Sequence, residues 1–92
     1  MSNSYTDVIV SANTINTQAA ALITQLRTGS ASASVITQCS ALVVTHTAYT
    51  TAKTGLIQKS DWMAIQNEMA DVFVGADSNI ATIKNFLAVY GY

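Results

Sequence analysis

The fold is decided by residues 60–90, which read SDWMAIQNEMADVFVGADSNIATIKNFLAVY. The apolar residues of this stretch recur in steps of three and four, which is the spacing of a heptad seam on an α-helix and fits no β-strand. A second line beside this seam recurs every seven residues, at Phe73, Ile80 and Leu87. Two such lines make a stripe wide enough to contact two partner helices. The predicted seam consists of Trp62, Ile65, Met69, Val72, Ala76, Asn79, Ile83, Phe86 and Tyr90.

The chain ahead of this stretch supplies two partner helices with the same spacing. Ser4 is placed to cap the first of them, and Gly29 is placed to end it in a left-handed conformation. The second keeps the spacing from Val35 to Tyr49, but it is rich in β-branched residues, so a strand is the competing interpretation. We therefore expect an all-α protein, a three-helix antiparallel bundle that forms a single domain. The predicted helices are residues 5–27, 32–53 and 60–90 of the domain 1–92.

Gly75 is the weak point of the third helix, because glycine destabilises a helix interior by about 1 kcal/mol. Asp77 or Ser78 is placed to cap a fresh start just after it. A kink or short break near Gly75 is therefore one of two outcomes that we consider. In the other outcome the helix is continuous and overhangs its partners by about two turns, and the exposed aromatic residues of the overhang would seek a pocket on another molecule.

Asn79 lies on the seam of the third helix, and Asn16 lies beside the seam of the first. A buried asparagine at such a position costs stability and tends to fix register or oligomeric state. The alternative is that the seam opens to solvent at this point. Together with the predicted overhang, this reasoning gives a candidate oligomer interface of Asn79, Phe86, Leu87, Tyr90 and Tyr92.

Charged residues are scarce in this chain. They make up 10% of the sequence, against about 25% in an ordinary soluble domain, and the formal net charge is −1. Such a surface does not attract nucleic acid or anionic lipid, and it does little to keep copies of the chain apart. We therefore expect the partners to be copies of the chain itself, with other proteins of the same assembly as further candidates.

The sequence carries no motif for catalysis or metal binding. Cys39 and His46 lie seven residues apart on one helix face, which separates them by about 10 Å and prevents a Cys–His nucleophile pair. The carboxylates of Glu68 and Asp71 are three residues apart, but such pairs are common on solvated helix faces. We expect no enzyme activity, no cofactor and no metal site.

Residues 8–26 and 30–52 are uncharged and long enough to span a bilayer, although their many amide and hydroxyl side chains disfavour insertion. The N-terminus lacks a basic region followed by an apolar run, so we expect no secretory signal. The composition is similar to that of virion proteins and exported filament subunits. We therefore favour a structural subunit of a homo-oligomeric assembly, either a small phage-like virion protein or an extracellular filament subunit. A small helical adaptor and a membrane-inserting pore or pilin-like subunit are the alternatives.

Overall fold

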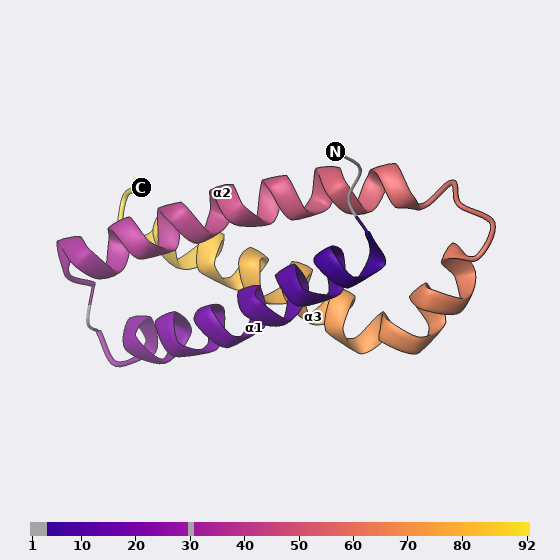
Figure 1. The fold of residues 1–92 in the computed structure, drawn as a ribbon. Helices are drawn as coiled ribbons and strands as arrows, with labels where there is room; N and C mark the ends of the chain where they lie inside the picture. The colour runs from indigo at the N-terminus through magenta and orange to yellow at the C-terminus, as the bar shows by residue number, and fades with distance from the viewer. Residues whose placement is uncertain (1–3, 30) are drawn as a thin grey trace.

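Three α-helices make up the computed structural model, which describes residues 4–29 and 31–92. They are α1 (Tyr5–Arg27), α2 (Ala33–Leu56) and α3 (Trp62–Val89). Each helix packs against the other two, and the molecule measures 45 × 24 × 17 Å (Figure 1). The predicted all-α bundle of three helices is confirmed, and the competing strand interpretation of the second segment is wrong. Ser30, the first residue of the connector between α1 and α2, lies outside the described residues.

The first two helices begin at serine caps. The Ser4 hydroxyl accepts a hydrogen bond from the Asp7 backbone N–H at 3.1 Å, and the Asp7 carboxylate accepts one from the Ser4 N–H at 3.2 Å. This reciprocal pair satisfies two N–H groups that a helix start would otherwise leave without partners. Ser32 caps α2 in the same way through the Val35 N–H. Gly29 ends the turn after α1 at a φ of +83°, a conformation that glycine adopts without steric cost.

The start of α3 differs from the predicted start at residue 60. The helix begins at Trp62, with Asp61 at the cap position but no side-chain cap hydrogen bond. The Asp61 carboxylate instead accepts a hydrogen bond from the Tyr5 hydroxyl of α1. A tertiary contact therefore replaces the local cap. The end of α2 also differs, because the helix continues three residues past the predicted end, to the buried Leu56.

The apolar seam of α3 shifts its phase by one residue at Met69, where the backbone leaves helical geometry (φ −110°, ψ 15°). Before this point the packed residues are Trp62, Ile65 and Met69, as predicted. After it, the fully buried line is Phe73, Ala76, Ile80, Ile83 and Leu87. Two successive four-residue steps, 65 to 69 to 73, make a stutter in the heptad pattern. The predicted seam positions beyond the stutter, apart from Ala76 and Ile83, are therefore only half-buried or exposed.

The bend at Met69 brings two aromatic rings together. In a straight helix Trp62 and Phe73 would be about 16 Å apart along the axis, yet their ring centroids are 5.7 Å apart and nearly parallel. Figure 1 shows the first turns of α3 crossing the end of the molecule before the chain runs along the bundle. The Tyr5 ring lies 6.1 Å from the Trp62 ring, so the bend also closes this end of the core against α1.

The predicted overhang of α3 is wrong, because the bend shortens the helix along the bundle. Leu87 is buried and Phe86 packs against the core. The Tyr90 hydroxyl donates a hydrogen bond to the Leu26 carbonyl of α1 at 3.3 Å. The C-terminal turn of α3 therefore lies against the end of α1.

Gly75 stays helical and lies against α1. A Cβ atom at this position would lie 3.4 Å from Asn16 Oδ1, an ordinary contact distance, so Gly75 packs directly beside the Asn16 amide between α1 and α3. Asn16 Nδ2 donates to the Val72 carbonyl at 3.1 Å, and Asn79 Nδ2 donates to Asn16 Oδ1 at 2.8 Å. The two asparagines are thus bonded to each other within the chain, and they set the axial position of α3 against α1.

We predict that this polar link behaves as a coupled unit. Asn16→Leu or Asn79→Leu alone should lower the free energy of unfolding by about 1 kcal/mol or more, because each leaves a half-buried amide without its partner. The double replacement should cost less than the sum of the two. Denaturant unfolding of the four proteins measures this coupling, and additive losses would contradict the prediction.

Candidate functional site

Cys39 is a core residue. Its side chain is 0% exposed, and burial raises the pKa of its thiol above the ordinary value. Both effects oppose formation of the thiolate that a nucleophile or a metal ligand requires. Cys39 therefore packs as a small apolar side chain.

His46 forms a contact that the sequence did not reveal. Its Nε2 atom lies 2.7 Å from Asp77 Oδ1 of α3. The His46 side chain is 15% exposed and that of Asp77 is 54% exposed, so the pair lies at the rim of the α2–α3 contact. The Tyr49 ring stacks obliquely on the imidazole at 5.6 Å. The predicted role of Asp77 or Ser78 as a helix cap is wrong, because both lie inside α3.

The surroundings of this pair hold aromatic and cationic groups. Lys53 Nζ lies 5.5 Å from the Tyr49 ring centroid and 5.3 Å from that of Phe73. Within residues 4–29 and 31–92, no three side chains of histidine, cysteine, aspartate or glutamate are grouped so that they could hold a metal ion. The His46–Asp77 pair therefore links two helices and orients the imidazole.

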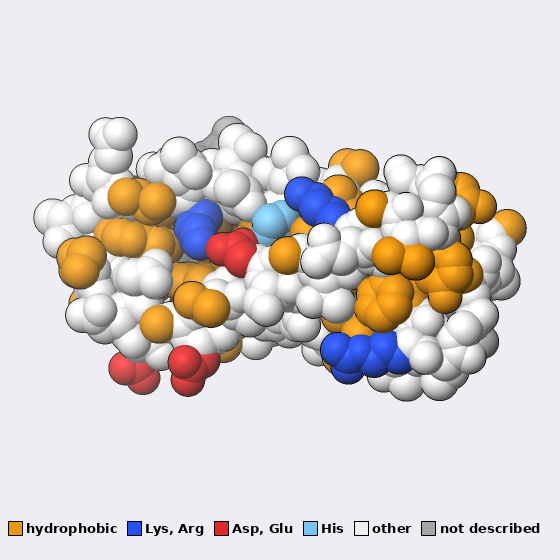
Figure 2. Space-filling view, turned by 180° about the vertical axis from the view of Figure 1, so that it is seen from behind, with side chains coloured by type: hydrophobic (Ala, Val, Ile, Leu, Met, Phe, Trp, Pro, Cys, Tyr) orange, Lys and Arg blue, Asp and Glu red, His pale blue; other side chains and the backbone are white. Residues whose placement is uncertain are grey.

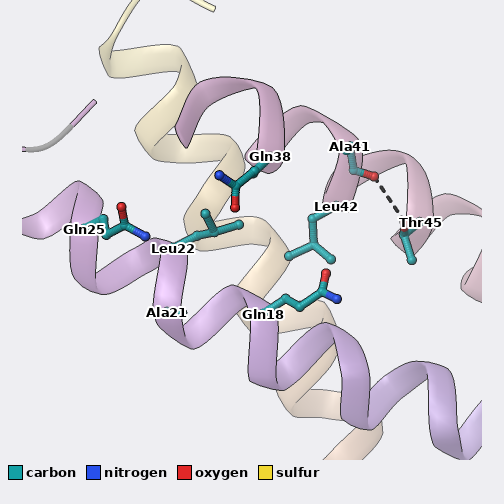
Figure 3. A pocket seen from close by; sticks show the side chains of 8 residues that line it. All are labelled: Gln18, Ala21, Leu22, Gln25, Gln38, Ala41, Leu42 and Thr45. Atoms are coloured by element: carbon teal, nitrogen blue, oxygen red, sulfur yellow. Dashed lines mark hydrogen bonds between the residues drawn. The ribbon is translucent and has the colours of Figure 1, made fainter. Parts of the chain in front are cut away.

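A groove of about 410 Å³ lies between α1 and α2. Figure 3 shows the amide side chains of Gln18, Gln25 and Gln38 around it, with Leu22 and Leu42 between them. Its described lining contains no ionisable side chain. The groove can therefore offer hydrogen bonds and apolar contact, but it cannot transfer protons. We call it the glutamine groove.

A second groove, of about 340 Å³, lies between α2 and the C-terminal turns of α3. We call it the Tyr92 groove. It is partly apolar, and it carries one cation. The lining residues are Ser40, Val43, Lys84, Leu87, Ala88 and Tyr92.

The structure separates the five residues of the candidate interface. Leu87 belongs to the core, while Asn79 and Tyr90 are bonded to α1. Phe86 is half-buried, and Tyr92 remains exposed at 74%. A straight α3 would carry these residues on an overhang, and the stutter at Met69 removes that overhang. Most of the exposed apolar surface lies outside the predicted interface, and the exposed large apolar residues are Val10, Val44, Ile57, Met63, Val74, Val89, Tyr90 and Tyr92.

No helix in the part of the chain that the structure describes has both the length and the apolar character needed to cross a membrane.

We predict that Cys39 reacts with thiol reagents only after unfolding. In native buffer, labelling should be slow, because the thiol is buried and its pKa is raised. In denaturant, labelling should be complete within the mixing time. Mass spectrometry of quenched samples measures both rates, and rapid labelling of the folded chain would contradict the placement of Cys39.

Two tyrosines should make the chain sensitive to alkali. Burial, and then the charge of Asp77, raise the pKa of Tyr49 to about 12. Partial burial, and then the hydrogen bond and charge of Asp61, raise the pKa of Tyr5 to about 12. An unfolded tyrosine has a pKa of about 10. The folded chain therefore keeps protons that the unfolded chain has lost, and stability should fall as pH rises from about 10 to about 12.

Tyrosinate absorbance and circular dichroism, recorded together against pH, measure this effect. Tyr49→Phe should flatten the pH dependence of stability across the same interval, because it removes one of the two raised groups. The prediction fails if all the tyrosines titrate as a single group near pH 10 while the helix content stays unchanged.

Comparison of the chain with protein-family models, with curated proteins and with solved structures finds no match in any of the three.

Proposed function

We propose that this chain is a non-enzymatic structural subunit of a homo-oligomeric assembly. In this proposal the antiparallel three-helix bundle is the repeating unit of a small phage-like virion structure or of a filament. The observation that carries the proposal is the chemistry of the exposed helix faces. These faces are poor in charge and rich in side chains that a second copy can cover at little cost.

The threonines of α2 are the clearest case. The hydroxyls of Thr47, Thr51 and Thr54, which share one face of α2, each donate to the backbone carbonyl four residues earlier, at 2.9–3.2 Å. A buried hydroxyl normally costs free energy because its donor loses water. Here the donor is already used within the helix. Another molecule can therefore cover this face without leaving the hydroxyl donors unsatisfied.

Apolar side chains also lie exposed on α2 and α3. Val44 is 69% exposed on α2 and Val89 is 81% exposed on α3. Figure 2 shows apolar side chains in patches over both halves of the face that it displays, with blue, red and pale blue side chains lying between the two patches. Covering apolar surface stabilises an interface by about 25 cal/mol for each Å², and few charges here would oppose the approach of a second copy.

A helical adaptor that binds a different protein is the second candidate. The Tyr92 groove favours it, because it places an exposed aromatic side chain beside apolar and cationic groups. Aromatic residues in such settings are common anchors of protein interfaces. An adaptor would be monomeric by itself, whereas a structural subunit would associate with its own copies.

The native mass of the purified chain tests the proposal. At tens of micromolar, light scattering should report particles well above the 9.7 kDa of one chain. A monomer over the whole concentration range would count against self-assembly and in favour of an adaptor. Flotation with liposomes would instead support the membrane-inserting alternative.

We predict that assembly depends on exposed side chains at the C-terminal end. Tyr92→Ser combined with Val89→Ser should reduce the mass of the particle and leave the helix content unchanged, because both residues are exposed. Leu87→Ser is the matched control inside the core, and it should lower the stability of the fold. Particles of unchanged mass in the double variant would show that assembly uses other surfaces.

A further inference from the structure

The two halves of the molecule carry opposite charge. Tyr5 bonds to Asp61 and Tyr90 bonds to Leu26, so α1 and α3 begin in one half and end in the other. The side-chain carboxylates all belong to residue 7 and residues 61–77. We call the half where the two helices begin the acidic half, and its carboxylates are Asp7, Asp61, Glu68 and Asp71. This half also holds two cations, because Lys59 lies over the Tyr5 ring and Lys53 lies over the Phe73 ring. Four carboxylates and two cations leave it a formal side-chain charge of −2.

The opposite half, which we call the basic half, holds Arg27 and Lys84. The sequence contains no aspartate or glutamate in residues 8–60 or 78–92, so the nearest carboxylate along the chain is Asp77, seven residues before Lys84. On the face shown in Figure 2, red side chains lie on the left and near the centre, with blue beside the central red, and the right-hand part shows blue without red. The molecule is therefore an elongated body, 45 Å long, with oppositely charged halves.

Each half also presents apolar surface. In the basic half this surface is concave. It is the Tyr92 groove, where Val43 and Ala88 lie beside the Lys84 cation. In the acidic half it is formed by Ile57 and Met63, on either side of the short connector between α2 and α3, and these side chains are 48% and 64% exposed. Methionine is a flexible side chain that adapts to irregular apolar sites and packs well against aromatic rings.

We propose that the Tyr92 groove of one copy binds the Ile57–Met63 surface of the next copy. This inference rests on the proposed function, because it assumes that the chain associates with its own copies. The acidic half of each molecule then meets the basic half of its neighbour. Burial of Met63 supplies the affinity, and opposite charge selects this pairing over contacts between like halves. Because the two surfaces differ, the contact is heterologous, and repetition of such a contact builds a ring or a filament.

Two variants, each with one of the two docking surfaces blocked by a substitution, test this contact. Ala88→Glu places a carboxylate in the groove and leaves Met63 intact. Met63→Glu removes the apolar side chain and leaves the groove intact. Both residues are exposed, so each variant should fold, and circular dichroism verifies this. Val74→Glu, at an equally exposed apolar position of α3 outside both surfaces, is the matched control.

Each blocked variant should be monomeric alone, since each lacks one of the two surfaces. Mixed in equal amounts, they should form a complex of twice the monomer mass, because the intact Met63 of one binds the intact groove of the other. The Val74→Glu control should assemble like the wild-type chain. Raising the salt concentration should weaken the complex, because the halves attract through exposed charges. If Ala88→Glu loses helix content, Lys84→Glu replaces it.

The outcomes separate this contact from the proposed function. If the wild-type chain assembles but the mixture stays monomeric, this contact is wrong and the proposed function stands. If Ala88→Glu alone still assembles as the wild type does, the groove is not the docking site. If the wild-type chain is itself a monomer, the proposed function fails and the inference fails with it.

Discussion

The packing of Phe73 is the constraint on which the rest of the structure depends. Its side chain is 1% exposed. It stacks on Trp62 from the first turns of its own helix, and the Tyr49 ring of α2 lies 6.4 Å away. Trp62 can reach this position only because α3 bends at Met69. The bend moves the apolar stripe of α3 into the space between α1 and α2. It therefore determines which apolar residues of α3 are buried and which are exposed at the surface.

The surface that results is unusual in its low charge and its internally bonded threonines. Hydroxyl donors that bond to their own helix, exposed valines and a separation of charge between the two halves all favour contact between copies of the chain. The His46–Asp77 pair and the Asn16–Asn79 link have a different role, because their polar groups are used between helices of one molecule. These ionisable and amide groups thus join helices within one molecule.

Much of the helical architecture could be predicted from residue spacing and capping chemistry. The three-four spacing indicated three helices, and Ser4 with Asp7 located the start of α1. These signals are local, because a cap depends on residues three positions apart and a helix face on residues three or four apart. The stutter was also present in the sequence, as the line of Phe73, Ile80 and Leu87. Periodicity alone did not tell which of two adjacent lines would be buried.

Residue spacing and composition were enough to specify the helical class, the scarcity of charge and the placement of four of the five carboxylates in residues 61–77. Only the folded molecule fixes the bend at Met69, the burial of Leu87 and the pairing of His46 with Asp77, and it brings Gly75 beside Asn16. The physical reason is the same in each case. These contacts join residues on different helices or on either side of a bend, and their energies depend on which faces meet. Local propensity specifies the helices, whereas the choice between two nearly equivalent apolar lines is made by the two partner helices that cover one of them.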